Sequence, residues 1–99
     1  MVKIASDSSE IPSKGLVLID FFATWCGPCK HIAPKFEELS KVYTNVTFLK
    51  VDVDESAELA EFFHIRAMPT FVFLRDGAIV KKIEGADLKA IGAMLEQTW

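Results

Sequence analysis

"LVLIDFFATWCGPCKHIAPKF", residues 16 to 36, joins two structural patterns within a few residues. Residues 16 to 22 form an apolar run interrupted only by Asp20, and such a run predicts a strand buried on both faces of a sheet. From Gly27 onward, apolar residues recur at three- and four-residue steps, which predicts an amphipathic helix ending near Tyr43. The chain's 2 cysteines, Cys26 and Cys29, therefore fall where the strand gives way to the helix.

The remaining chain continues the alternation of strand and helix. Residues 46 to 53 are rich in β-branched residues and predict a second strand, and residues 55 to 63 predict a short helix. Strands 70 to 74 and 78 to 83 are joined through Asp76-Gly77, which is typical of an antiparallel hairpin, and Asp87 can cap a last helix. The predicted fold class is α/β, with a central mixed sheet flanked by helices.

Length and composition limit the classes of protein. A chain of 99 residues that is 51% hydrophobic fits a single domain over residues 1 to 99. The net charge is −3 and the basic residues are scattered, which argues against a nucleic-acid or anionic-membrane partner. The sequence has no apolar run of about 18 residues and no apolar signal-peptide core, so we expect a cytoplasmic protein, most simply a monomer.

The two cysteines could form a structural crosslink, a metal clip, a redox couple or a pair of inert buried thiols. Cys26 directly precedes the predicted helix, where unpaired backbone N–H groups and the positive end of the helix dipole favour a thiolate. Pro28 suits the first helical turn because its missing N–H needs no partner there. Cys26 is therefore the expected nucleophile, and Cys29, one turn further on and more shielded, is the expected resolving thiol.

The metal and inert interpretations are the weaker ones. A structural zinc site takes about four ligands, and besides the cysteines only His31 and His64 offer nitrogen, at positions that do not converge with the cysteines. A cluster shared between two chains would need the cysteines of a dimer. Free cysteine is often a small core residue, but an exposed strand-to-helix corner is a poor place for one. In the cytosol a C-x-x-C pair is more often catalytic or metal-binding than a permanent staple.

Several motifs now give a resemblance to a known family. "WCGPCK" after "LIDFFAT", "FLKVDVDE" at 48 to 55, "MPTF" at 68 to 71 and Gly85-Ala86 occur in the order found in the thioredoxin family. The resemblance covers roughly residues 16 to 99. It implies a thioredoxin fold and a thiol-disulfide oxidoreductase that exchanges a dithiol and a disulfide with protein substrates.

The resemblance also implies a chemical cycle. Cys26 attacks a substrate disulfide, Cys29 displaces the reduced substrate, and a redox-active Cys26–Cys29 disulfide results. A flavoprotein reductase of the thioredoxin reductase kind, supplied by NADPH, would reset the pair. The expected partners are that reductase and diverse disulfide-containing proteins, with no bound cofactor and no metal.

Two charged residues are expected to support the cysteines. Asp20 interrupts a central strand, where burial should raise its pKa, and the resemblance makes it the acceptor of the Cys29 proton through water. The alternative is an edge position at which Asp20 meets solvent. Lys50 can tune the Asp20 pKa, or it can be an ordinary strand lysine that extends to water.

A third region completes the expected site. Pro69 opens a strand and cannot donate a hydrogen bond, so the backbone of Met68 is left free. The resemblance implies a cis Pro69 facing the cysteines and a substrate that adds to Met68 as a short strand. Core packing is the alternative for Trp25 and Met68. The expected docking residues are Trp25, Gly27, Pro28, Met68, Pro69, Gly85 and Ala86.

The N-terminal region departs from the family pattern. Residues 6 to 15 offer few apolar positions and no helical period, so the first helix should be short or missing. Pro34 should kink its helix, and Trp99 has no assigned role. Two other functions stay open on the same fold: a more oxidising disulfide oxidase or isomerase, and a redox-silent binding module.

Overall fold

A five-stranded mixed sheet forms the centre of the protein, and the computed structural model describes it through residues 1–97 and 99. The strands lie in the order β1-β3-β2-β4-β5. Strands β1 (Val2–Ile4), β3 (Val46–Asp52) and β2 (Leu16–Phe22) run parallel, whereas β4 (Thr70–Arg75) and β5 (Ala78–Glu84) form the predicted antiparallel hairpin. The predicted α/β class and mixed sheet are confirmed.

Strand β2 is the centre of the sheet because β3 pairs with one of its edges and β4 with the other. Successive side chains of a strand point to opposite faces, so the apolar run of β2 serves two cores. Val17, Ile19 and Phe21 pack on the α2 side, while Leu18 packs on the α1 and α3 side. This double burial explains why the strand lacks the polar alternation of a one-sided sheet.

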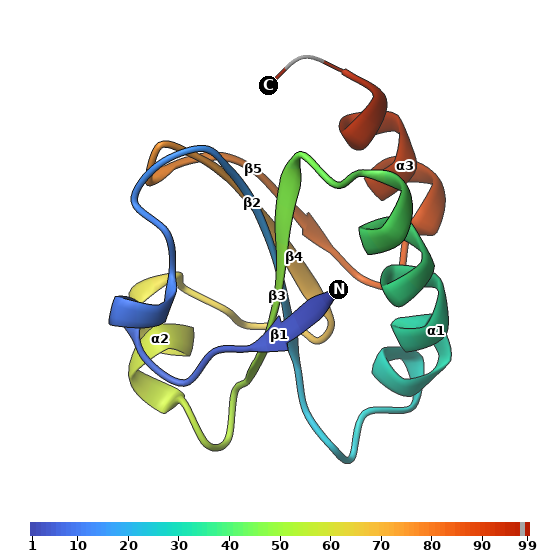
Figure 1. The fold of residues 1–99 in the computed structure, drawn as a ribbon. Helices are drawn as coiled ribbons and strands as arrows, with labels where there is room; N and C mark the ends of the chain where they lie inside the picture. The colour runs from blue at the N-terminus through green and yellow to red at the C-terminus, as the bar shows by residue number, and fades with distance from the viewer. Residues whose placement is uncertain (98) are drawn as a thin grey trace.

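The helices cover both faces of the sheet. Helices α1 (Gly27–Val42) and α3 (Leu88–Glu96) lie on one face, and α2 (Ala57–Phe62) lies on the other (Figure 1). Helix α1 continues through Pro34 as one element, and Asp87 caps α3 as predicted by accepting a hydrogen bond from the backbone N–H of Ala90 at 3.0 Å. The resulting α/β/α layering places the start of α1 at the carboxyl end of β2.

Aromatic contacts attach the helices to the sheet. Phe36 of α1 packs against Phe48 and Phe71, with ring centroids 5.2 and 5.6 Å away. Trp99, to which the sequence assigned no role, is buried edge-on against Phe73 at 5.1 Å. These aromatic pairs contribute both buried apolar area and a preferred geometry.

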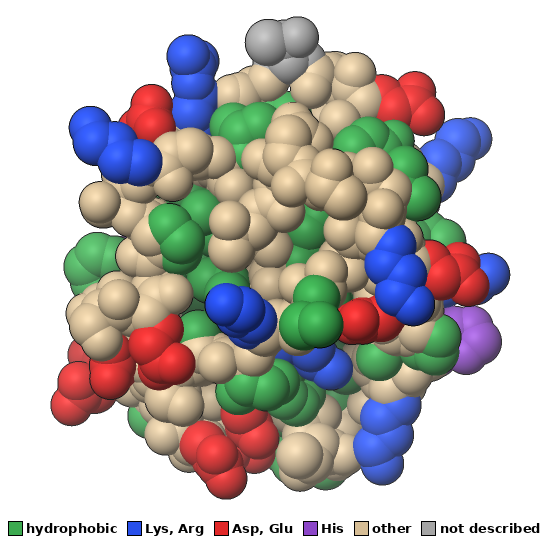
Figure 2. All heavy atoms as spheres, in the orientation of Figure 1, with side chains coloured by type: hydrophobic (Ala, Val, Ile, Leu, Met, Phe, Trp, Pro, Cys, Tyr) green, Lys and Arg blue, Asp and Glu red, His purple; other side chains and the backbone are tan. Residues whose placement is uncertain are grey.

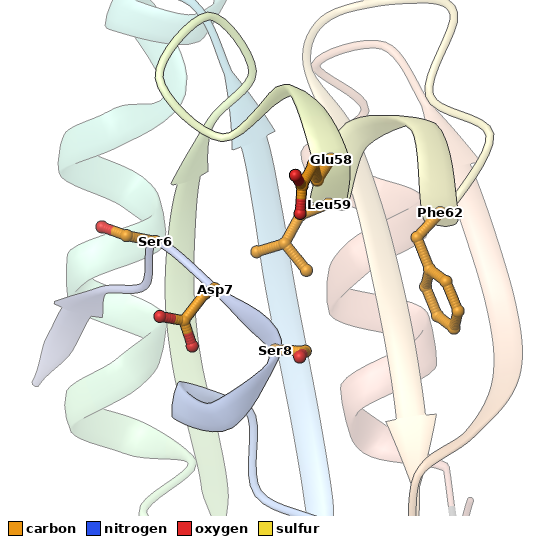
Figure 3. A pocket seen from close by; sticks show the side chains of 6 residues that line it. All are labelled: Ser6, Asp7, Ser8, Glu58, Leu59 and Phe62. Carbon is orange, nitrogen blue, oxygen red and sulfur yellow. The ribbon is translucent and has the colours of Figure 1, made fainter.

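The N-terminal region is short, as predicted. In place of a full first helix there is a single 3₁₀ turn, η1 (Ser8–Glu10), in which Asp7 and Glu10 form a reciprocal capping box. The sequence analysis missed β1, which extends the sheet by pairing with β3. A shallow hollow separates this segment from α2, with Ser6, Asp7 and Ser8 on one side and Glu58, Leu59 and Phe62 on the other (Figure 3).

The surface carries charges of both signs. Lysine and arginine side chains alternate with aspartate and glutamate over the face drawn in Figure 2, and no single sign dominates it. Among residues 1–97 and 99, none of the helices has the length and apolar character needed to cross a bilayer.

We expect Phe36→Ala to lower the free energy of unfolding by about 3–5 kcal/mol, because it removes a fully buried ring that holds α1 on the sheet. The matched control on the same helix is Val42→Ala, since the Val42 side chain is 71% exposed and its change should stay within about 0.5 kcal/mol. Urea denaturation of both variants measures the difference. Equal effects of the two substitutions would contradict this account of the core.

Candidate active site

The two cysteines occupy the corner between β2 and α1. Cys26 is the N-cap residue of α1 with an extended backbone (φ −87°, ψ 114°), and Pro28 lies in the first turn. The Cys26 Sγ accepts a hydrogen bond from the backbone N–H of Cys29 at 3.2 Å. Their Cα atoms are 5.3 Å apart and their sulfur atoms are joined as a disulfide. The positions of both cysteines at a helix N-terminus agree with the sequence analysis.

Both cysteines are shielded in this oxidised pair. Cys26 is 5% exposed and Cys29 is 3% exposed, so the expected contrast in shielding between them is small. They pack with Ala23, and the half-buried side chains of Phe22 and Met68 lie against this cluster. The exposed residues of the corner are its neighbours Thr24, Trp25, Gly27 and Pro28. Any molecule that reaches the buried sulfur atoms would therefore first contact these four exposed residues.

Asp20 is a fully buried carboxyl group in the central strand. The edge alternative is wrong, since β2 is paired on both sides and Asp20 is 0% exposed. Neither of its carboxyl oxygens has a hydrogen-bond partner within the described part of the chain. Burial raises the pKa of Asp20 to about 7, because the charged form loses its hydration. A carboxyl group with this pKa can take up or release a proton near neutral pH.

The strand geometry places Asp20 behind the cysteines. Asp20 and Phe22 are two positions apart, so they share one face of the sheet, and Phe22 packs on the cysteine cluster. Leu18, on the same face, packs beneath α1 and α3. Asp20 therefore lies on the α1 side of the sheet, one step deeper than Phe22.

Lys50 is the charged neighbour of Asp20. The two residues are directly paired in the register of β2 and β3, and the positive charge of Lys50 lowers the Asp20 pKa, partly offsetting the effect of burial. The Lys50 ammonium lies 4.4 Å from the centroid of the Phe22 ring, in a cation–π contact. The structure thus favours the tuning alternative for Lys50 over that of an isolated surface lysine.

The segment before β4 forms the other wall of the site. The Met68–Pro69 peptide bond is cis, as the resemblance implies, and Pro69 is buried. The Pro69 carbonyl accepts a hydrogen bond from the backbone N–H of Gly85 at 2.8 Å, and Gly85 adopts a φ of 94° that favours glycine. Met68 is half-buried and packs against the cysteine cluster, and its backbone makes no hydrogen bond within residues 1–97 and 99.

Trp25 is an exposed residue of the corner, so core packing is wrong for it. Its side chain is 67% exposed, and its Nε1–H donates a hydrogen bond to Asp54 Oδ2 at 2.9 Å. The sequence analysis did not single out Asp54, although it quoted the "FLKVDVDE" motif that contains it. Asp54 fixes the orientation of a ring that solvent would otherwise leave free. Ala86, the remaining expected docking residue, is also exposed.

The described residues bring together no group of three or more His, Cys, Asp and Glu side chains that could hold a metal ion. His31 lies on α1 and His64 follows α2, and both are exposed.

Comparisons with known proteins agree with this architecture. A family profile described as Thioredoxin matches residues 3–97. Thioredoxin-1 of Schizosaccharomyces pombe is 48% identical over 100 residues, which covers 97% of each chain. A solved thioredoxin structure from Plasmodium falciparum superposes with a TM-score of 0.89 at 46% identity and covers 95% of this chain and 96% of that one. Oxidised mitochondrial thioredoxin 3 of Saccharomyces cerevisiae gives a TM-score of 0.90 at 38% identity, covering 96% and 93%.

We expect Asp20→Asn to stabilise the protein increasingly as the pH rises from about 4 to about 7, with little effect below that range. In this interval the unfolded carboxyl ionises while the folded one keeps its proton, so wild-type stability falls with pH. Above pH 7 the gain should reach up to about 4 kcal/mol, the free-energy equivalent of the pKa shift. Urea denaturation of both proteins from pH 3 to pH 9 measures it. Parallel stability curves would show that Asp20 titrates normally.

Proposed function

The chain belongs to the thioredoxin family and is a thiol-disulfide oxidoreductase, and from that premise we propose how its residues and partners share the reaction. The observation that carries the proposal is the disulfide-bonded pair at the start of α1, with the unpaired Asp20 carboxyl buried on the same side of the sheet. The direction of the reaction is the reduction of protein disulfides. The oxidase or isomerase alternative is not favoured.

In the first step Cys26 is the nucleophile. The N–H of Cys29 that points at Cys26 Sγ stabilises the thiolate, as does the positive end of α1. The thiolate attacks one sulfur of the substrate disulfide, the substrate S–S bond breaks, and a Cys26–substrate mixed disulfide forms. The departing substrate sulfur leaves as a thiolate and takes a proton from solvent.

In the second step Cys29 resolves the mixed disulfide. Asp20, ionised in a fraction of molecules because its pKa is about 7, accepts the proton of the Cys29 thiol. The Cys29 thiolate attacks Cys26 Sγ, forms the Cys26–Cys29 disulfide and releases the second substrate thiolate. The protein has then given two electrons to the substrate, the second substrate thiolate takes a proton from solvent, and Asp20 later releases the Cys29 proton to solvent. Lys50 keeps the Asp20 pKa from rising further.

Substrate docking uses the surface around the sulfur atoms. The free backbone of Met68 pairs with an extended substrate segment, and the cis Pro69 holds that backbone beside the cysteine cluster. Backbone pairing does not depend on the substrate's side chains, so many proteins can be accepted. The exposed residues Trp25, Gly27, Pro28 and Ala86, together with Gly85, complete the contact area.

Membership of the family supports the remaining parts of the proposed cycle. A flavoprotein reductase of the thioredoxin reductase kind returns electrons from NADPH to the Cys26–Cys29 disulfide, so the chain needs no bound cofactor. We propose a monomeric, single-domain cytoplasmic protein spanning residues 1 to 99.

We expect Cys29→Ser to trap substrate proteins as mixed disulfides on Cys26, because no second thiol remains to release them. Non-reducing gel electrophoresis of the variant incubated with oxidised protein substrates measures the adducts. The control is Cys26→Ser, which should form almost none. Adducts of equal yield on both variants would contradict the assignment of Cys26 as nucleophile.

We expect the Cys26/Cys29 pair to have a reduction potential near about −270 mV, which is typical of thioredoxin, rather than about −180 mV, which is typical of protein disulfide isomerase. Equilibration against glutathione buffers of known ratio measures it. A value near the second marker would reverse the direction of electron flow and support the oxidase or isomerase function. Failure to form any disulfide would support the redox-silent binding module.

A further inference from the structure

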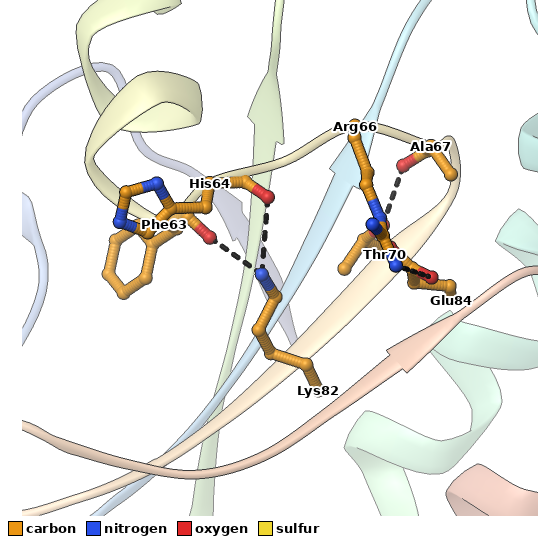
Figure 4. Close-up of polar contacts among 7 residues, drawn as sticks. All are labelled: Phe63, His64, Arg66, Ala67, Thr70, Lys82 and Glu84. Carbon is orange, nitrogen blue, oxygen red and sulfur yellow. Dashed lines mark hydrogen bonds and ion pairs between the residues drawn. The ribbon is translucent and has the colours of Figure 1, made fainter.

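The connector from Phe63 to Pro69, which joins α2 to β4, is attached to the neighbouring end of β5. Three successive contacts make the attachment. Figure 4 shows the first two, the side-chain bonds from Lys82 and the ion pair of Arg66 with Glu84. The third is the backbone hydrogen bond from the N–H of Gly85 to the carbonyl of Pro69. The connector ends at Met68 and Pro69, so it carries the backbone on which the proposed docking depends. None of the three contacts touches a cysteine.

Lys82 makes the first of these contacts along the connector. Its Nζ donates hydrogen bonds to the carbonyl oxygens of Phe63 at 2.8 Å and His64 at 3.2 Å. These carbonyls follow the last residue of α2, where the helix leaves its carbonyl groups unpaired and its dipole is negative. An ammonium group satisfies both requirements at once. The side chain is half-buried, so its bonds are better protected from water than those of a free surface lysine.

The backbone at His64 shows why such a clamp is needed. His64 has a φ of 54°, in the left-handed region that favours glycine. A side chain other than glycine in this region costs on the order of 1 kcal/mol, and the conformation persists where surrounding contacts fix it. Lys82 bonds the carbonyl of His64 and the carbonyl just before it. It therefore fixes the bend that turns the chain from α2 toward Met68.

The ion pair supports the same connector further along. Arg66 Nε lies 2.9 Å from Glu84 Oε2, and the two side chains are 82% and 39% exposed. A pair this exposed contributes little to global stability. Within the connector, Thr70 Oγ1 donates to the carbonyl of Ala67, which closes the turn immediately before β4. The Arg66–Glu84 pair therefore adds a third contact to a connector that Lys82 and Gly85 already hold at its two ends.

We propose that Lys82 is a positioning residue for substrate docking, supported by the Arg66–Glu84 pair: it holds the connector so that the free backbone of Met68 faces an incoming protein disulfide. This inference rests on the proposed function. Because Lys82 contacts no cysteine and not Asp20, it acts on substrate binding and leaves the reduction potential of the dithiol unchanged. Small disulfides, which have no backbone to pair with Met68, are indifferent to it.

The test compares Lys82→Met with Lys81→Met. Methionine keeps the length of the lysine stem and removes the ammonium. The side chain of Lys81 is exposed and makes no hydrogen bond or ion pair within the described part of the chain. The pre-reduced proteins are mixed with increasing insulin, and the limiting rate and half-saturating concentration of disulfide reduction are measured. The same proteins are mixed with 5,5′-dithiobis(2-nitrobenzoic acid), a small aryl disulfide, and their reduction potentials are determined.

We expect Lys82→Met to raise the half-saturating insulin concentration about five- to tenfold with an unchanged limiting rate, because a contact common to ground and transition states is lost. The aryl disulfide rate and the reduction potential should stay unchanged, and Lys81→Met should behave as wild type. Glu84→Gln, a milder change at a partly exposed side chain, should raise the same concentration about two- to threefold. Lys82→Arg, which keeps a cationic donor, should restore most of the docking.

Two results would overturn the proposal. One is an unchanged half-saturating insulin concentration in Lys82→Met. The other is a parallel loss with insulin and the aryl disulfide, which would place the effect of Lys82 on the redox pair itself. Failure of the proposed function looks different, since the wild-type protein would then reduce neither disulfide.

Discussion

The hydrogen bond from the backbone N–H of Cys29 to the sulfur of Cys26 is the contact on which the active corner depends. It forms because β2 ends at Phe22 and α1 begins at Gly27, which leaves Cys26 as the N-cap residue. The same unpaired N–H groups that donate hydrogen bonds to an N-cap side chain also stabilise a thiolate. The burial of β2 on both faces and the aromatic contacts of α1 fix the two elements that meet at this corner.

The buried carboxyl group of Asp20 lowers the stability of the fold that positions the cysteines. An unpaired carboxyl in a central strand opposes folding once it ionises, and burial shifts its pKa to about 7 for that reason. The fold tolerates it because apolar clusters on both faces of the sheet supply the stability. A carboxyl group that titrates near neutral pH, as the proposed proton acceptor must, and a destabilised core position are therefore two consequences of one location.

The sequence by itself determined the local elements and the chemistry of the corner. The apolar run at 16–22 and the helical spacing after Gly27 depend on neighbouring residues only, so each could be read without the fold. Asp76-Gly77 likewise predicted the hairpin between β4 and β5 from the dipeptide alone. The sequence analysis missed strand β1 because its three residues are too few to show an alternating pattern beside a polar segment. The cis bond at Pro69 and the docking role of the surface came from family likeness, since no local pattern specifies them.

Only the tertiary structure decided which distant residues meet. The pairing of Asp20 with Lys50, the hydrogen bond from Trp25 to Asp54 and the bonds from Lys82 to the end of α2 join residues 18 to 30 positions apart. Sheet register and helix placement set these contacts, and they result from the packing of the whole chain rather than from any one segment. The sequence could name the reacting sulfurs, because helix N-termini act on their nearest residues. It could not name the distant residues that contact and orient the site, because those contacts depend on long-range packing.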